Sequence, residues 1–209
     1  MKNNLTSIKK SRILEMHVEL EHAEPRIWRS FQVYDSISMY QLHEILQVVM
    51  GWMHSHLFQF KSKELIIAEP SFGDEWENIE FKNARKTKVA AIFKSPGDAL
   101  IYQYDFGDSW YHKLRFQRVV DESERMFKVP RCMAGENACP PEDCGGFPGF
   151  EELKRVISDP ENEEYESMIQ WLDGYYPNYD PNEFSLGEVN KILKIGASKF
   201  LRLEPKFYE

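Results

Sequence analysis

The chain has 209 residues, a formal net charge of −8, 42% hydrophobic residues and 29% charged residues. This composition is typical of a protein with its own hydrophobic core and excludes a disordered chain. No apolar run approaches the ~18 residues that span a bilayer, and the N-terminus lacks the apolar core of a signal peptide. We therefore expect a cytoplasmic protein without membrane association. It should form a single domain over residues 1–209, with residues 1–11 as a flexible N-terminus.

The acidic balance also bears on partners. A negative surface repels phosphate backbones, so nucleic-acid binding is expected to be weak or absent. One dense cationic cluster stands against this balance, and we interpret it as a solvated face. It consists of Lys82, Arg85, Lys86 and Lys88.

The first third of the chain shows clear periodicity. Residues 13–20 alternate apolar and polar side chains, which predicts a half-buried strand, and a second strand is expected over residues 26–34. Ser38 and Gln41 form a capping-box pattern ahead of apolar residues at helical spacing. Gly51 suits the left-handed position after the last turn, so we predict a helix between Ser38 and Gly51.

The middle of the chain is read as strands joined by turns. Short strands are expected at 56–61 and 65–68, followed by an exposed loop at 69–80, while 87–93 fits either a short helix or a strand. A hairpin is expected from strands 99–105 and 110–120, with its turn centred on Gly107-Asp108.

The remainder divides into a loop and helices. Residues 130–149 contain four Pro, four Gly and all three Cys, which predicts an ordered loop. Helical stripes follow, with one around residues 150–157, one beginning at Asp159-Pro160, and one opened by Ser185 and closed by Gly196. The fold class is therefore α+β: a mostly antiparallel sheet, one helix of the N-terminal half packed on it, and a helical C-terminal region.

Several motifs along the chain together form a recognisable pattern. They are Pro25-Arg26-Ile27-Trp28-Arg29, Met50-Gly51-Trp52, His56-Leu57-Phe58-Gln59-Phe60, Tyr102-Gln103-Tyr104-Asp105-Phe106-Gly107-Asp108-Ser109-Trp110, Pro130-Arg131-Cys132 and Cys139-Pro140-Pro141-Glu142-Asp143-Cys144-Gly145-Gly146. These stretches resemble the plasmid pRiA ORF-3-like protein family, which is prokaryotic, uncharacterised and found on plasmids and mobile elements. The resemblance spans most of residues 13–195 and implies no established reaction, substrate or catalytic residue. Some members of the family are labelled transposition-associated.

The predicted hairpin holds the first pair of candidate catalytic residues. A turn centred on Gly107-Asp108 places Asp105 opposite Trp110 and Gln103 opposite His112. Asp105 then lies at diagonal reach of His112 on an apolar face. The pair fits a core histidine oriented by a carboxylate, and it also fits a general base or a metal ligand held by that carboxylate.

Two further candidate catalytic residues, Glu142 and Asp143, lie in the Pro- and Gly-rich loop. Such a loop can hold two carboxylates in fixed positions, or it can cap the following helix. We expect any catalytic or small-molecule site to lie where the hairpin of Asp105 and His112 meets the loop 139–146.

Metal binding is not favoured by the sequence. Cys132, Cys139 and Cys144, with His112 as a fourth ligand, are the candidates for zinc, but their spacing lacks the Cys-x-x-Cys unit of zinc ribbons. No cofactor is therefore expected, and the cysteines should be free thiols. His54 and His56 share the i, i+2 spacing of some metal ligands, but a pair of loop histidines is the preferred interpretation.

Three classes of function remain open. We favour a non-enzymatic binding or adaptor domain for a protein or small molecule, which would use exposed aromatic side chains. The alternatives are a metal-dependent or Asp/His-dependent hydrolase and a transposition-associated nucleic-acid-binding protein. The aromatic candidates are Trp52, Trp76, Tyr175 and Tyr176.

Overall fold

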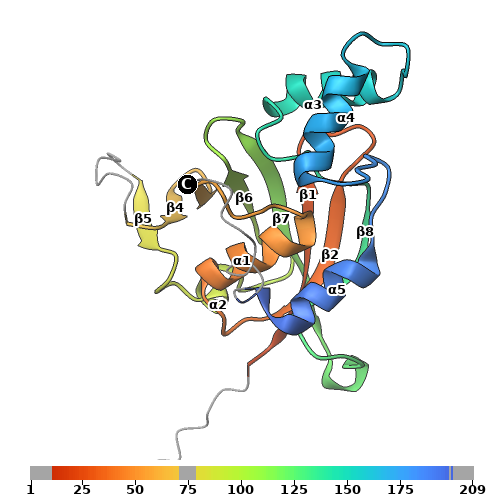
Figure 1. The fold of residues 1–209 in the computed structure, drawn as a ribbon. Helices are drawn as coiled ribbons and strands as arrows, with labels where there is room; N and C mark the ends of the chain where they lie inside the picture. The colour runs from red at the N-terminus through yellow and green to blue at the C-terminus, as the bar shows by residue number, and fades with distance from the viewer. Residues whose placement is uncertain (1–10, 71–78, 198, 200–209) are drawn as a thin grey trace, which may run out of the picture.

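An eight-stranded sheet organises the computed structural model, which describes residues 11–70, 79–197 and 199 (Figure 1). The strand order is β5-β4-β3-β6-β7-β1-β2-β8. Neighbouring strands are antiparallel except for the β4–β5 pair, which is parallel. The strands are β1 (Ile13–Leu20), β2 (Trp28–Tyr34), β3 (Phe58–Lys61), β4 (Leu65–Ala68), β5 (Glu80–Asn83), β6 (Ala99–Tyr104), β7 (Trp110–Val120) and β8 (Arg131–Glu136).

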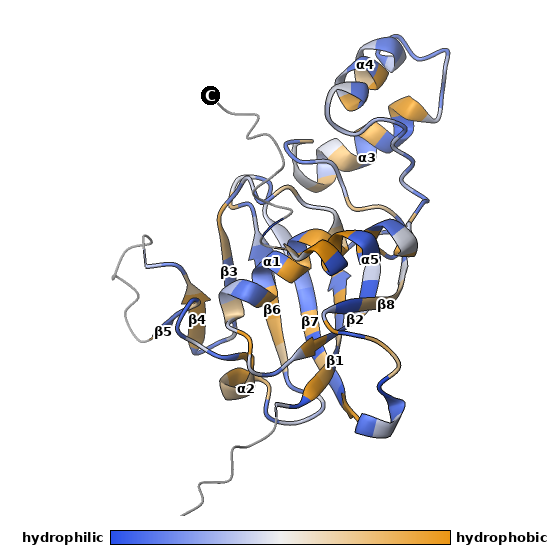
Figure 2. Cartoon of the chain, turned by 60° about the horizontal axis from the view of Figure 1, so that its bottom comes forward, coloured by the Kyte–Doolittle hydropathy of each residue, from blue (hydrophilic) through white to orange (hydrophobic). Residues whose placement is uncertain are grey.

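Helices cover one face of this sheet and extend beyond one end of it. Figure 2 shows α1 and α5 in front of the strands, and in Figure 1 α3 and α4 lie together past the end of the central strands. The helices are α1 (Met39–Met50), α2 (Val89–Ile92), α3 (Gly146–Ile157), α4 (Tyr165–Tyr175) and α5 (Leu186–Ile195), with a 3₁₀ turn at Glu122–Glu124. The predicted α+β class, with a mostly antiparallel sheet and C-terminal helices, is confirmed.

Helix α1 forms where local sequence rules predict it. The Ser38 side chain accepts a hydrogen bond from the Gln41 amide, and the Gln41 side chain accepts one from the Ser38 amide. Gly51 ends the helix with φ 103°, a conformation that favours glycine. Most of the helix is buried, because its apolar face packs on the sheet and α5 packs against it from another side.

Two predictions for the second half of the chain were wrong. The stretch predicted as a loop at 130–149 contains β8 and the start of α3, because β8 pairs along β2 and this pairing overrides its weak local pattern. The helix predicted from Asp159 begins instead at Tyr165. The Asp159 carboxylate accepts from the Glu161 amide, so this residue closes a turn ahead of the helix.

The register of the β6–β7 hairpin also differs from the prediction. Tyr104 pairs with Trp110 and Tyr102 pairs with His112, whereas Asp105 lies in the connection. This five-residue loop closes through the Ser109 amide, which donates to the Asp105 carbonyl at 2.8 Å. An odd loop length shifts the pairing by one residue, so the tyrosines take the core face on which Gln103 and Asp105 were expected.

Other expectations concern the periphery. In the part of the chain that the structure describes, no helix has the length and apolarity needed to cross a membrane. The ambiguous segment 87–93 contains the short helix α2. Two members of the basic cluster form ion pairs, Lys82 with Glu80 and Arg85 with Glu69. Of the expected flexible N-terminus at 1–11, residues 1–10 lie outside the described residues, as does Trp76.

Candidate functional site

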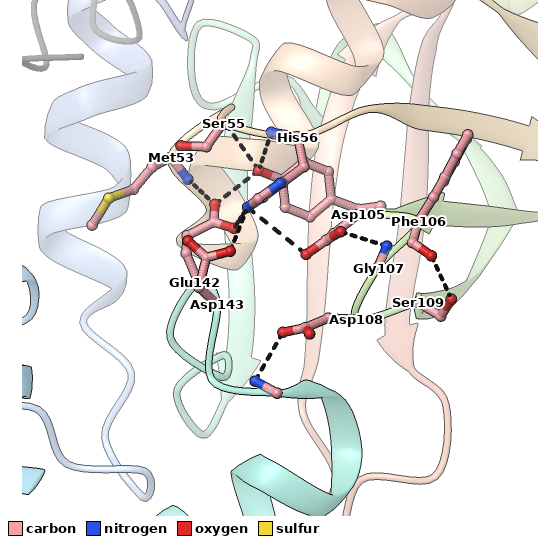
Figure 3. A network of polar contacts seen from close by, with 12 residues as sticks. Met53, Ser55, His56, Asp105, Phe106, Gly107, Asp108, Ser109, Glu142 and Asp143 are labelled. Atoms are coloured by element: carbon pink, nitrogen blue, oxygen red, sulfur yellow. Dashed lines mark hydrogen bonds and ion pairs between the residues drawn. The ribbon is translucent and has the colours of Figure 1, made fainter. Parts of the chain in front are cut away.

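Four ionisable side chains from three separate segments converge beside the end of β6 (Figure 3). His56 precedes β3, Asp105 follows β6, and Glu142 and Asp143 precede α3. The His56 Nε2 atom lies 3.2 Å from Asp143 Oδ1, 3.6 Å from Glu142 Oε2 and 3.8 Å from Asp105 Oδ2. Asp105 and Glu142 are buried, whereas His56 and Asp143 reach the surface. One imidazole nitrogen is therefore surrounded by three carboxylates.

Both aspartates of this cluster are held by left-handed backbone. Asp105 has φ 53° and Asp143 has φ 57°, conformations that side chains other than Asn, Asp and Gly rarely adopt. The Asp105 amide donates to the Leu57 carbonyl at 2.9 Å, and its Oδ1 accepts from the Gly107 amide at 2.8 Å. One carboxylate oxygen thus fastens the turn, which leaves Oδ2 directed at His56.

Glu142 is anchored in the same way through a single oxygen. Its Oε1 accepts from the Met53 amide at 2.7 Å and from the Tyr104 hydroxyl at 2.8 Å, and its own amide donates to the Tyr176 hydroxyl at 2.8 Å. Burial raises the pKa of this carboxyl to about 7, against the opposing effect of its hydrogen bonds. Glu142 therefore exchanges a proton near neutral pH, unlike an exposed glutamate.

The other oxygen of Glu142 has a different environment. Among the described residues, neither Glu142 Oε2 nor His56 Nε2 has a hydrogen-bond partner, although both atoms are buried. Buried polar atoms without partners are rare in native proteins and often mark a bound ion or water. These two atoms face each other across 3.6 Å.

The donor geometry suits a small cation. Ligand atoms of His56, Asp105 and Asp143 all lie within 4.8 Å of one another, the one group of this kind in the described part of the chain. Tetrahedral zinc, with ligand bonds of about 2.0–2.2 Å, holds its ligand atoms roughly 3.4 Å apart. The observed separations of 3.2 Å and 3.8 Å from His56 Nε2 lie on either side of that value.

A cavity and a larger cleft open beside the cluster. The cavity has a volume of about 110 Å³, and its lining includes Glu142, Asp143 and the aromatic rings of Trp171, Tyr175 and Tyr176. The cleft has a volume of about 370 Å³, lies between α3 and α4, and shares Asp143 and Trp171 with the cavity. Asp143 thus connects the buried carboxylates with a space large enough for a small ligand.

His112 takes a different place from the other candidate residues. It is fully buried in the core, where the Trp52 Nε1 donates to its Nε2 at 3.4 Å and its Nδ1 donates to the Tyr102 carbonyl at 3.2 Å. Burial lowers the pKa of this histidine to about 4. His112 is a neutral core histidine with both ring nitrogens engaged, whereas Asp105, Glu142 and Asp143 come together as the site.

The sequence did not indicate that His56 lies among the carboxylates. His54 and His56 were expected to act as a pair, but their side chains have different surroundings. The His54 amide donates to Gln47 Oε1 at 2.7 Å, and the His54 ring lies against the buried His43, with 2.7 Å between ring nitrogens. His56 instead turns toward the carboxylates. The i, i+2 spacing indicated a histidine pair, but the partners of His56 come from segments 49 and 86 residues further along the chain.

None of the three cysteines belongs to this group of ligand atoms among the described residues, although Cys144 directly follows Asp143 and lines the cleft with it. Cys132 Sγ contacts the carbonyl oxygens of Ser30 and Ala134, each at 3.5 Å. Burial raises the pKa of Cys132 to about 11 and of Cys144 to about 12, and it also raises the pKa of Cys139. All three therefore stay as thiols at neutral pH.

The structure also differs from the prediction about which aromatic side chains are exposed. Trp52 is only 3% exposed and packs 5.8 Å from Trp110 between ring centroids, so it belongs to the core. Tyr175 is 45% exposed, and Tyr176 is half-buried at the cavity. Of the described aromatic candidates, those that reach solvent, Tyr175 and Tyr176, line the cavity beside the carboxylate cluster.

Comparisons with known proteins agree with this architecture. A protein of Sinorhizobium fredii described as "Uncharacterized protein y4hQ" is 29% identical over 190 residues, covering 91% of this chain and 95% of that protein. The crystal structure of a protein of unknown function, MM3350 from Methanosarcina mazei Go1, has a TM-score of 0.71 and 30% identity, and the match covers 84% of this chain and 96% of that one. Neither description names an activity or a cofactor. Residues 12–188 match the family described as "Plasmid pRiA4b ORF-3-like protein", and the chain belongs to that family.

Proposed function

We propose that this chain binds one divalent transition-metal ion through His56 Nε2, Asp105 Oδ2 and Asp143 Oδ1, and uses it for a hydrolytic reaction. The observation that carries the proposal is the pair of buried atoms, His56 Nε2 and Glu142 Oε2, which lack hydrogen-bond partners among the described residues. A cation among these donors would satisfy the imidazole nitrogen and neutralise carboxylates whose burial is costly.

The donor set supports this class of ion. Imidazole nitrogen favours transition metals over magnesium and calcium, and carboxylates complete the shells of zinc and manganese. Three protein ligands leave a coordination position for water, as in catalytic rather than structural sites. That position would face the cavity lined by Asp143 and Trp171. A bound ion supplies Lewis acidity there, polarising a carbonyl or phosphoryl oxygen or acidifying water.

Glu142 is suited to a second task in the same reaction. Its Oε1 is held by two hydrogen-bond donors, so the side chain cannot swing away. Its Oε2 keeps free acceptor capacity and lies next to the proposed ion. We assign it the role of proton acceptor for a water molecule bound in the cavity.

A different interpretation of the cluster needs no metal. A protonated His56 would by itself offset part of the negative charge of the three carboxylates, and the cavity would then belong to a binding or adaptor domain. The two interpretations differ in the affinity that they predict for a divalent ion. Conservative variants of the two aspartates and of His56 test this affinity directly.

The test is titration calorimetry of the protein, stripped with chelator, with Zn²⁺, Mn²⁺ and Mg²⁺. We expect one site per chain and tighter binding of the transition metals. At 100 times the dissociation constant, the ion should add about 2.7 kcal/mol to the free energy of unfolding. D105N, D143N and H56Q should abolish the site. The matched control is H17Q, because His17 also forms an ion pair with a carboxylate, that of Glu19.

Equal binding by wild type and H56Q, or none by either, would contradict the metal site. The hydrolytic step has its own test, a panel of p-nitrophenyl esters, p-nitrophenyl phosphates and p-nitroanilides. E142Q should keep the ion and lose turnover, whereas D105N should lose both. Turnover that survives in E142Q would overturn the role of Glu142.

We also propose a cytoplasmic location. The three cysteines are free thiols, and Cys132 and Cys139 are buried. Thiols of this kind fit a reducing compartment, in which disulfides are rare.

A further inference from the structure

We infer that the cleft between α3 and α4 recognises an organic cation, a ligand carrying an alkylammonium group. This inference rests on the proposed function, since the cleft opens on the same Asp143, but it concerns what binds next to the ion. The ammonium group could belong to a small polyamine or to a lysine side chain of a peptide, and the two sources share the same recognition chemistry.

The charge of the cleft is the first argument. No residue that lines the cleft or the adjoining cavity is Lys, Arg or His among those the structure describes, whereas Glu142, Asp143 and Glu164 all are part of the lining. Together with Asp105 these residues supply four carboxyl groups, of which Glu142 is only partly ionised near neutral pH, and a divalent ion offsets two charges, so a net charge of about −1 to −2 is left. The space therefore stays negative with the ion bound and disfavours an anionic ligand.

Arg155 of α3 is bound mainly to a neighbouring acid of its own helix. Arg155 donates two hydrogen bonds to the Glu152 carboxylate and is fully exposed on the helix surface. Its charge also acts on Glu164, but Arg155 does not line the cleft, so it offsets part of one carboxylate and leaves Asp143 and Glu142 unaffected.

The aromatic wall is the second argument. Trp171 lines both the cleft and the cavity, and Tyr175 and Tyr176 line the adjoining cavity. Tyr176 is fixed in place, because its hydroxyl accepts from the Glu142 amide at 2.8 Å. Aromatic faces next to carboxylates attract ammonium groups through the negative face of the ring.

The buried Glu142 is the third argument, and it is independent of the surface acids. This side chain is 6% exposed and lines the cavity, and its Oε2 lacks a hydrogen-bond partner within the described residues. Leu153 and Met168 add apolar surface in the cleft, which suits the methylene chain of an alkylammonium ligand. The volume of about 370 Å³ lies within the range of small-molecule sites.

The experiment compares probes that differ in charge and little else. N-acetyl-lysinamide and N-acetyl-norleucinamide share an aliphatic chain, but only the first carries the ammonium group. Spermidine represents a free polyamine, and inorganic phosphate and adenosine monophosphate represent anions. Binding is measured by titration calorimetry on the full chain, both stripped with chelator and loaded with Mn²⁺.

We expect N-acetyl-lysinamide to bind more tightly than N-acetyl-norleucinamide. W171L should weaken binding of the ammonium probe by about 3- to 30-fold, the range expected for loss of a cation–aromatic contact. E164Q should weaken it by about 2- to 5-fold, the range expected for loss of an exposed charge partner. E166Q is the matched control, because Glu166 is an exposed acid of α4 outside the cleft lining. Tighter binding of spermidine indicates a polyamine, whereas tighter binding of the lysine amide indicates a peptide.

Equal affinity for the two amides, or tighter binding of phosphate or adenosine monophosphate, would overturn the inference. The failure of the metal site gives a different pattern. In that case Mn²⁺ does not bind, and the stripped protein still prefers the ammonium probe. If Mn²⁺ binds but E164Q and W171L leave probe affinity unchanged, the proposed metal site stands and the inference about the ammonium site in the cleft fails.

Discussion

The Tyr104 hydroxyl donates a 2.8 Å hydrogen bond to Glu142 Oε1 and accepts one from the Ser55 amide at 3.0 Å. One side chain of β6 therefore joins the segment before β3, which carries His56, to the segment before α3, which carries Glu142. Because Tyr104 is buried in the core, its position is set by packing and it transmits that position to both segments.

Removing this hydroxyl should destabilise the fold and loosen the site. Y104F leaves the Ser55 amide without its acceptor and Glu142 Oε1 without one of its two donors. This loss should cost about 1–3 kcal/mol in the free energy of unfolding. Urea denaturation measures the change in the free energy of unfolding. Y111F, on the half-buried neighbouring strand position, should change it by less than about 0.5 kcal/mol. Similar losses in the two variants would contradict the bridging role of Tyr104.

Asp105 should be replaceable by Asn but not by Ala in terms of stability. Asn tolerates the φ of 53° and keeps an oxygen that accepts from the Gly107 amide, whereas Ala loses this hydrogen bond and strains the backbone. We expect D105A to lose about 1–3 kcal/mol and D105N to lose less than half as much. Thermal unfolding of the chelator-treated protein gives both values, and equal losses would show that the turn does not need the acceptor.

Acid should destabilise the protein between about pH 6.5 and pH 4 through His112. Its pKa is lowered by burial to about 4, so below pH 6.5 the unfolded chain binds a proton that the folded chain does not. The stability present above pH 6.5 is therefore lost as pH falls, by on the order of 3 kcal/mol once pH 4 is reached. His43, whose pKa burial also lowers, adds to the same loss.

The measurement is the free energy of unfolding against pH for wild type and H112N, each relative to its own value at pH 7.5. H112N should have a shallower slope over this window, because it removes one of the two buried histidines. H17N, on a partly exposed strand position, is the control and should follow the wild-type slope. A slope unchanged by H112N would mean that His112 is not held neutral by burial.

Substitution by alanine should have opposite effects on stability at two glycines, Gly149 of α3 and Gly174 of α4. A Cβ on Gly149 would lie 1.8 Å from the Cys144 carbonyl oxygen, so G149A must displace the chain next to Asp143. We expect a loss of at least about 1–3 kcal/mol and weaker divalent-ion binding. A Cβ on Gly174 in α4 would meet no neighbouring side chain or other element within 4 Å, so G174A should stabilise by about 0.5–1 kcal/mol. Calorimetric melting of both variants checks the contrast, and a neutral G149A would contradict it.

Local rules determined a large part of this fold. The alternation over Ile13–Leu20 predicted β1 with its observed bounds, and the capping box and Gly51 predicted the ends of α1. The same holds for α5, whose first turn is capped by Ser185. These signals arise from side chains a few residues apart, and they act before any long-range contact forms.

The sequence also indicated most of the cluster. Asp105, Glu142 and Asp143 were expected at the meeting of the hairpin and the loop, and the structure brings these two segments together through the Gly145 amide, which donates to Asp108 at 3.1 Å. The prediction that His112 shares a face with Asp105 was wrong. The turn is one residue longer than expected, and a one-residue change in turn length reverses which side chains share a face.

Tertiary structure alone decided which histidine meets the carboxylates. His56 and His112 carry the same chemistry, and the apolar face around His112 fits both a core histidine and a catalytic one. The choice follows from the pairing of β3 with β6, which brings the segment of His56 alongside Asp105, and from the hydrogen bond that Tyr104 donates to Glu142. It is set by contacts between residues tens of positions apart, which a sequence pattern of period two or 3.6 does not encode.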